Sequence, residues 1–200
     1  MDASAVIGDN GLLNLTLIGE DSREIVRQAL DFRVYAGQRI SFSQQIPFEI
    51  KGAGETARLV ISSNDRFGRL IGVASVDLVL LQIGDEQIYP GLVTLEPYVV
   101  TFPKPGEAVQ GGILQLVGLA RPVNAMPIVI ELIDERGQVV GSGQVVVAPP
   151  SGGHTHTPFR VAVAYTVTGA TPARLTLRQE SDTRIPGTVA LSSVLILLQP

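Results

Sequence analysis

Cysteine and tryptophan are absent from this 200-residue chain, and aromatic residues make up only 5% of it. Without cysteine there can be no disulfide, no thiol catalysis and no thiolate metal site. The scarcity of aromatic rings leaves few surfaces that stack on sugars or nucleobases. Charged residues are also few, at 17%, and the formal net charge is −4. A net negative chain without a basic cluster lacks the electrostatic character of a nucleic-acid-binding protein, so we expect no nucleic acid partner.

Long hydrophobic runs are missing as well. The longest apolar stretch, residues 194–198, is far shorter than the ~20 residues that span a bilayer, and no export signal is recognisable in the chain. We therefore expect no membrane span. What is abundant is aliphatic, since hydrophobic residues reach 45% and are mainly Val, Leu, Ile and Ala. A chain of this length and composition can form one large all-β domain or two sandwiches of about 100 residues each.

An internal repeat favours the second arrangement. Segments of the first half recur in the same order in the second half, and small loop insertions account for the drift in their spacing. The matches are residues 17–20 with 132–135 (offset 115), 47–48 with 158–159 (offset 111), 57–61 with 173–177 (offset 116) and 75–80 with 193–198 (offset 118). Several matches in one order indicate a duplication.

Each half consists of short runs rich in β-branched residues between Gly, Pro, Asn and Asp, which is typical of antiparallel strands joined by turns. In the second half the predicted strands are residues 99–102, 114–117, 128–133, 144–147, 159–165, 173–178 and 191–198. Seven strands make a sandwich. Arg174, Thr176 and Arg178 alternate with two leucines, so we expect these three side chains to face water.

One segment permits two interpretations. The apolar residues between Ile25 and Leu30 have the spacing of one amphipathic helical turn, after a cap at Asp21 and Ser22. Their repeat counterpart, residues 139–147, contains Gly141 and Gly143 and is a poor helix. We therefore favour a strand or an irregular edge over a helix.

The sequence thus predicts an all-β protein of two tandem immunoglobulin-like β-sandwiches. The first half is residues 1–82 and the second half is residues 98–200, joined by a linker at residues 83–97 that Pro90 and Pro97 make semi-rigid. Only the second half has an opening strand, so the first half is left with an unpaired edge. We expect residues 87–95, a partner chain or residues outside the sequence to cover that edge; self-association through it is a further alternative.

Several motifs of the second half carry a resemblance to a known family. They are residues 103–106 (PKPG), 117–120 (VGLA), 131–137 (ELIDERG), 158–159 (PF) and 179–181 (QES). With these motifs, residues 98–198 resemble the immunoglobulin-like domain associated with bacterial spore germination and found in envelope proteins and cell-wall-related enzymes. The first half is similar to the same family through residues 14–18 and 47–48, but it lacks the opening motif. The resemblance implies an accessory module of a bacterial extracytoplasmic protein and supplies no catalytic or ligand residue.

Few side chains suggest chemistry, and each has a plainer interpretation. His154 and His156, the only histidines, point the same way in an extended segment and could share one metal ion, but a metal site needs three or four ligands and we interpret them as a polar loop. Residues 52–54 (GAG) resemble a fragment of a phosphate loop but precede no helix. Neighbouring carboxylates fall in turns, where we expect them to be solvated: Glu20 with Asp21, Asp85 with Glu86, Asp134 with Glu135, and Glu180 with Asp182.

Arginines near the repeated strands could form an anion-binding face, although we favour solvation or local ion pairing: Arg58, Arg66, Arg69, Arg174, Arg178 and Arg184. We expect no enzyme, cofactor or metal site. The favoured function is a non-catalytic binding or spacer module that contacts a protein or cell-wall component through loops or a sheet edge. A carbohydrate- or peptidoglycan-binding module is the alternative, and it requires exposed aromatics to cluster on one face: Tyr35, Phe67, Tyr89 and Tyr98.

Overall fold

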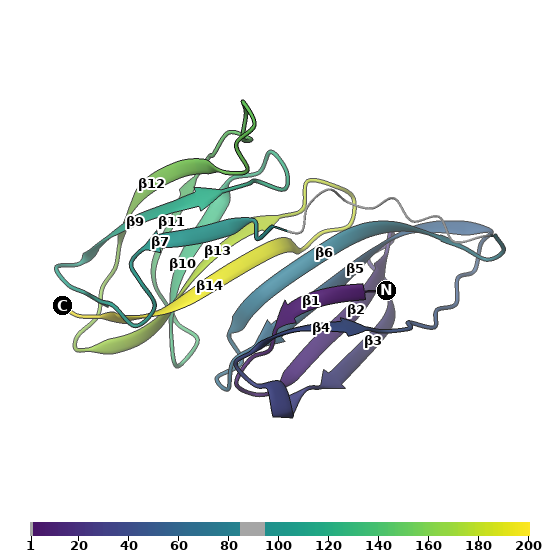
Figure 1. Cartoon of the computed structure of the whole chain (residues 1–200), viewed down its shortest axis with the longest axis horizontal. Coiled ribbons are helices and arrows are strands. Elements are labelled where there is room, and N and C mark those ends of the chain that lie inside the picture. The colour runs from purple at the N-terminus through teal and green to yellow at the C-terminus, as the bar shows by residue number, and fades with distance from the viewer. Residues whose placement is uncertain (1, 85–94) are drawn as a thin grey trace.

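The computed structural model describes residues 2–84 and 95–200 (Figure 1). Within these ranges the chain forms β-strands and a single 3-10 turn but no α-helix, which confirms the all-β prediction. The strands assemble into one nine-stranded sheet and two smaller sheets, and almost every pairing is antiparallel. The aliphatic, β-branched composition is therefore used as strand faces, as its alternation with polar residues indicates.

The first half contains two sheets. Antiparallel strands in the order β3-β2-β5-β6 belong to the large sheet, and β1 pairs with β4 in a separate two-stranded sheet. The strand over Glu24–Asp31 confirms the preference for a strand over a helix in this segment. The elements are β1 (Asp2–Val6), β2 (Leu12–Gly19), β3 (Glu24–Asp31), η1 (Arg33–Tyr35), β4 (Arg39–Ser43), β5 (Gly54–Asn64) and β6 (Leu70–Leu81).

The second half also contributes two sheets. Strands in the order β11-β10-β13-β14 continue the large sheet, β12-β9-β7 form a three-stranded sheet, and β8 pairs in parallel with β14. The elements are β7 (Tyr98–Phe102), β8 (Ala108–Val109), β9 (Ile113–Ala120), β10 (Ile128–Asp134), β11 (Val139–Val145), β12 (Thr157–Ala164), β13 (Thr171–Glu180) and β14 (Thr188–Leu198).

All seven strands predicted for the second half are present, but the bounds of β11 were wrong. The strand begins at Val139, five residues before the predicted start at Gln144. Gly141 explains the difference, because an added Cβ would lie 2.6 Å from the carbonyl oxygen of Ala164. A glycine that weakens a strand by propensity here permits β11 and the end of β12 to approach closely.

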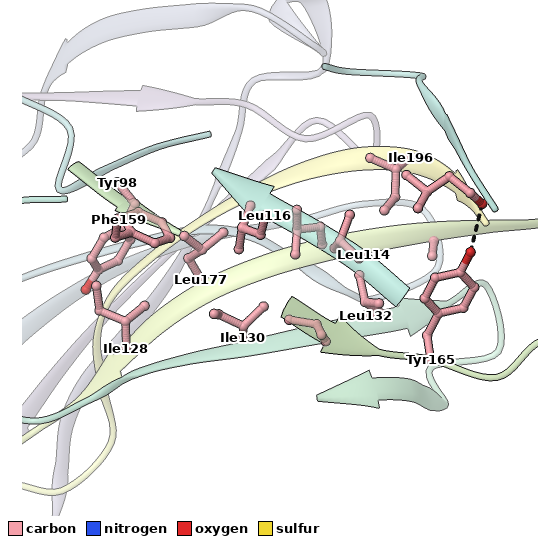
Figure 2. Packing of buried hydrophobic residues seen from close by; sticks show 14 of the residues in the cluster. Tyr98, Leu114, Leu116, Ile128, Ile130, Leu132, Phe159, Tyr165, Leu177 and Ile196 are labelled. Atoms are coloured by element: carbon pink, nitrogen blue, oxygen red, sulfur yellow. Dashed lines mark hydrogen bonds between the residues drawn. The ribbon is translucent and has the colours of Figure 1, made fainter. Parts of the chain in front are cut away.

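The core of the second half lies between its two sheets. Figure 2 shows Leu114 and Leu116 of β9 facing Ile130 and Leu132 of β10, and all four side chains are fully buried. Burying a leucine or isoleucine side chain contributes about 1.5–3 kcal/mol, so this layer dominates the stability of the second half. At one end of the layer, the Tyr165 hydroxyl donates a hydrogen bond to the Val109 carbonyl oxygen at 2.9 Å.

Among the described residues, the buried cluster of the first half joins Leu17, Ile50, Ala57, Leu59 and Leu80, and the cluster of the second half is larger. Ile7, Leu13 and Leu15 of the first half are also buried.

One match of the repeat, residues 47–48 with 158–159, does not lie at equivalent places in the two halves. Pro158 and Phe159 lie in β12, and Phe159 is buried, whereas Phe48 lies after β4 and is exposed. The halves therefore share a strand order but differ in how completely their sheets are covered.

Candidate interaction surface

The two halves meet edge to edge, and the junction is built from repeated residues. β6 and β14 pair antiparallel with Val73 opposite Leu191, so the large sheet runs through both halves (Figure 1). The offset of 118 that relates β6 to β14 makes Leu191 the counterpart of Val73. On either side, Ala190 pairs with Ala74 and Ser192 pairs with Gly72. By the same offset Ala190 is the counterpart of Gly72 and Ser192 that of Ala74, so exchanging the two halves turns one pair into the other. A local two-fold axis therefore passes between Val73 and Leu191, as in a symmetric dimer interface.

Two serine hydroxyls obey the same symmetry. Ser75 Oγ of β6 donates to the Val189 carbonyl oxygen at 2.9 Å, and its counterpart Ser193 Oγ donates to the Ile71 carbonyl oxygen at 2.7 Å. Each hydroxyl crosses the junction to a backbone acceptor of the other half. Such a bond contributes about 1 kcal/mol, so this pair supports the short β6–β14 ladder from both sides.

Two counterpart arginines also cross the junction. Arg58 Nη1 donates to the Ile185 carbonyl oxygen at 2.7 Å, and Nη2 donates to Thr183 Oγ1 at 2.9 Å, both in the loop between β13 and β14. Arg174 reaches the opposite loop, between β5 and β6, where its Nε lies 3.1 Å from Asp65 Oδ2. Both arginines are buried.

Asp65 is the acceptor at the centre of the more deeply buried side. Its Oδ2 accepts from Arg69 Nε at 2.8 Å as well as from Arg174, and Arg69 Nη1 donates onward to the Ile133 carbonyl oxygen at 3.0 Å. Desolvation raises the pKa of the Asp65 carboxyl, but the hydrogen bonds from Arg69 and the charges of Arg174 and Arg69 outweigh it and hold the pKa below its usual value. This ion cluster links the two halves.

The prediction that Arg174 and Thr176 face water was therefore wrong. Arg174 is 5% exposed because the loop of the first half that carries Asp65 lies against it, and Thr176 is buried with its hydroxyl bonded to the Glu131 carbonyl oxygen. Arg58 is buried against the β13–β14 loop of the second half, and Arg69 is buried against Asp65 and the Ile133 carbonyl, so neither lies on an anion-binding surface. Arg178 does pair locally, with Glu131 and Glu180.

The last two candidate arginines lie outside this cluster. Arg66 lies with its guanidinium 4.7 Å from the Phe67 ring centroid. Arg184 is exposed.

Beyond the junction, the outer edge of β14 is occupied. Residues 106–109 run along it and make three backbone hydrogen bonds: the Gly106 N–H to the Leu195 carbonyl, the Leu197 N–H to the Glu107 carbonyl, and the Gln199 N–H to the Val109 carbonyl, at 2.8–2.9 Å. This segment follows β7 and covers the core at the end of β14. The second half is therefore closed on this side.

The counterpart edge of β6 is open. By the offset of 118, the Asp77 carbonyl and the N–H groups of Val79 and Leu81 correspond to the paired groups of β14. Among residues 2–84 and 95–200, β14 is the one strand that pairs with this edge, and its pairing ends at Ala74. Val79 is 71% exposed, and Val76 is 49% exposed although its counterpart Val194 packs against the core of the second half. We call β6 from Val76 to Leu81 the open edge.

The sheet of β1 and β4 is incomplete in a matching way. β9 is flanked by β12 and β7, whereas within the described ranges β1 pairs with β4 alone. The absence of an opening strand in the first half stays a prediction. Of the residues 87–95 expected to cover the edge, 87–94 lie outside the described residues.

In the loop that carries His154 and His156, the ring of His156 is hydrogen-bonded within the protein. His156 Nε2 donates to the Glu96 carbonyl oxygen at 2.8 Å, and Nδ1 lies 3.0 Å from Thr155 Oγ1, so both ring nitrogens face protein oxygens. With Leu119 and Pro158 the loop lines an open depression. In the part of the chain that the structure describes, no three His, Asp or Glu side chains gather where they could hold a metal ion.

Two of the carboxylate pairs do lie in turns. Asp21 accepts the backbone N–H of Arg23, and Asp134 accepts those of Arg136 and Gln138, as expected for Asp in turns. Glu180 lies in β13 and pairs with Arg178, whereas Asp85 and Glu86 lie outside the described residues. Residues 52–53 lie in a bend before β5, and Gly54 is the first residue of that strand.

Of the aromatic residues expected to cluster on one face, Tyr98 is not on the surface. Tyr98 is 1% exposed and its hydroxyl donates to Gln179 Oε1 at 2.8 Å, so the inclusion of Tyr98 in an exposed cluster was wrong. Its position in the core follows from its place at the start of β7, and burial raises the pKa of the phenol. Tyr35 and Phe67 are exposed, and Tyr89 lies outside the described residues.

Comparison with protein-family models, curated proteins and solved structures gave no match. In residues 2–84 and 95–200 there is also no helix with the length and apolar character needed to cross a membrane.

Proposed function

We propose that this chain is a non-catalytic binding module of a bacterial extracytoplasmic protein. Two tandem immunoglobulin-like β-sandwiches act as one body, and the open edge of the first half contacts a partner. The observation that carries the proposal is the open edge itself, where exposed Val76, Val79 and Leu81 lie beside backbone groups of β6 that pair with no strand among the described residues. The extracytoplasmic assignment rests on the resemblance of the second half to a family of envelope-associated domains.

The buried polar groups support a structural use of the rest of the molecule. Within the described ranges, every buried side-chain nitrogen or oxygen has a hydrogen-bond partner. Asp65, Arg174 and Arg58 join the halves, and Gln179 ties Tyr98 to the loop at Asn124. These groups hold strands and loops in place, which suits a module whose task is to present a surface at a fixed position.

An exposed strand edge is a recognised binding element. Native proteins normally blunt a free edge with charges, proline or a covering segment, because its backbone groups pair readily with another strand. From Val76 to Leu81 the open edge carries one charged side chain, Asp77, and the Arg58 guanidinium pairs with it at 2.7 Å. Main-chain hydrogen bonds and apolar side chains together suit β-strand addition by a partner.

Site-directed photo-crosslinking tests this function. A photoreactive amino acid at position 79, incubated with bacterial envelope fractions, is expected to capture a discrete partner. The matched control is the same residue at position 146, because Val146 is 75% exposed but lies beyond β11 in the second half. Equal capture from both positions, or retention on whole peptidoglycan that no change at position 79 affects, would contradict the proposal.

A further inference from the structure

We infer that the open edge accepts a strand donated by another polypeptide, which lies along β6 as residues 106–109 lie along β14 and beside β1 as β7 lies beside β9. This inference rests on the proposed function and specifies how the partner is held. The occupant is an extended apolar segment with the chemistry of residues 98–109. The two strand edges then bind a segment in the same way: β14 binds residues 106–109 of its own chain, and β6 binds a segment of another polypeptide.

The backbone groups of β6 already have the required order. On β14 the acceptor at Leu195 and the donors at Leu197 and Gln199 hold a segment whose last two residues run parallel to the strand. The counterparts on β6 are the Asp77 carbonyl and the N–H groups of Val79 and Leu81. These groups point away from β5, because their counterparts at Leu195, Leu197 and Gln199 point away from β13 and toward residues 106–109. A strand parallel to β6 at Val79 and Leu80 would therefore pair without moving β5.

The side chains of the first half lack what such a strand supplies. In the second half Tyr98 and Val109 are buried and Val100 packs against the core. In the first half, Val76 is half exposed and Leu78 is only partly buried, although the counterpart of Leu78, Ile196, is 3% exposed. In the second half the residue of the segment at this end of the core is Val109, which pairs opposite Leu198, whereas Tyr98 lies at the other end, bonded to Gln179 opposite Ala190. The donated strand therefore has an inward-facing aliphatic residue in the place of Val109.

A second copy of this chain does not fit the edge as well. Its own residues 98–109 are held by Gln179, Tyr165 and the edge of β14. Two open edges related by a two-fold axis would pair antiparallel, whereas the occupied counterpart is parallel. Such a dimer would also leave β1 without a second neighbour. The geometry therefore disfavours a second copy of this chain as the donor.

A synthetic peptide of residues 98–110 of this chain (YVVTFPKPGEAVQ) serves as the probe against the full-length protein. Fluorescence anisotropy is expected to show saturable binding, and amide hydrogen exchange is expected to slow at Val79 and Leu81. A scrambled peptide of the same composition should not bind. Failure of the native peptide to bind, or protection that appears on β14 and not on β6, would overturn the inference.

Two variants locate the contact. Val79→Pro removes the N–H that faces the donor and should weaken peptide binding about tenfold, the effect of losing one well-formed hydrogen bond. Because that variant can disturb folding, the second change is made in the peptide: N-methylation at Gly106 removes its donor to Asp77, with N-methylation at Thr101, which the β7–β9 register skips, as the control. Equal binding of the two methylated peptides would contradict the register.

The outcomes separate this inference from the proposed function. If position 79 captures a partner but the peptide does not bind, strand donation is wrong while the open edge remains a binding surface. If position 79 crosslinks only to a second copy and sedimentation shows a dimer that excludes the peptide, the donor is not a different polypeptide and the inference fails.

Discussion

The two halves of this protein have corresponding strand orders but differ in how they are completed. β6 and β14 are counterparts with similar apolar sequences, yet residues 106–109 cover the outer edge of β14, while the described residues leave that of β6 open beyond Ala74. Among the described residues, the two halves therefore differ in what covers one edge of the shared sheet.

The largest expected effect comes from removing Asp65, and it is compared with the removal of Asp77 on the other side of the junction. Asp65→Ala leaves Arg69 and Arg174 buried without their carboxylate and should lower the free energy of unfolding by about 3–5 kcal/mol. The control is Asp77→Ala, because the Asp77 side chain is 47% exposed and the buried Arg58 keeps its hydrogen bonds to the Ile185 carbonyl and Thr183, so the loss should be smaller, about 1 kcal/mol. Urea denaturation measures both values. Equal losses would show that the Asp65 cluster does not join the halves.

A second comparison uses counterpart leucines. Leu198 lies in the closed core and Leu80 lies beside the open edge, and they match at the offset of 118. Leu198→Ala should destabilise by about 3–4 kcal/mol and Leu80→Ala by about 2 kcal/mol, because a cavity beside an open edge can fill with water or collapse. Thermal and urea unfolding give the two values. A larger loss for Leu80→Ala would mean that the first half is as completely closed as the second.

The pH dependence of stability sharpens the role of Asp65. The folded-state pKa of Asp65 lies below its unfolded value, so its contribution is present above about pH 4, the ordinary pKa of Asp, and is lost as the pH falls below that value. Unfolding free energies measured between pH 6 and pH 3 should therefore fall more steeply for the wild type than for Asp65→Asn. Parallel curves for the two proteins would contradict this assignment.

The smallest expected effect concerns the symmetric hydroxyls. Ser75→Ala and Ser193→Ala each remove one hydrogen bond across the junction, and each such loss should cost about 1 kcal/mol. Ser193→Ala also removes the acceptor of Arg174 Nη1 at 3.0 Å, so its total loss should be the larger of the two. Denaturation of the single and double variants checks this order. No loss for either serine would break the two-fold description.

Most of the local structure followed from the sequence, because strand formation depends on local patterns. The strands around Leu114, Ile130 and Leu175 were predicted correctly. The glycines in the repeat counterpart of the segment at Ile25 correctly favoured a strand there. The burial of Arg174 was missed because the loop that covers it belongs to the other half and lies 109 residues away along the chain. A local pattern of alternating polar and apolar residues cannot distinguish water from a second domain.

The junction nevertheless had a signal in the repeat. Arg58 with Arg174 and Ser75 with Ser193 recur at matched positions on otherwise aliphatic strands. Polar residues kept in both copies are expected where the copies meet around a two-fold axis, because each then makes the same contact in both directions. The register of Val73 opposite Leu191, however, depends on how the two sheets approach one another, and no property of either strand alone sets it.

The distance between the two halves tests the central claim most directly. Because the chain has no cysteine, Val34→Cys with Val146→Cys introduces exactly two labelling sites, both highly exposed and one in each half. If the shared sheet and the Asp65 cluster join the halves into one body, pulsed electron spin resonance should give a single narrow distance distribution that Asp65→Ala broadens. A broad distribution in the unaltered junction would contradict the account.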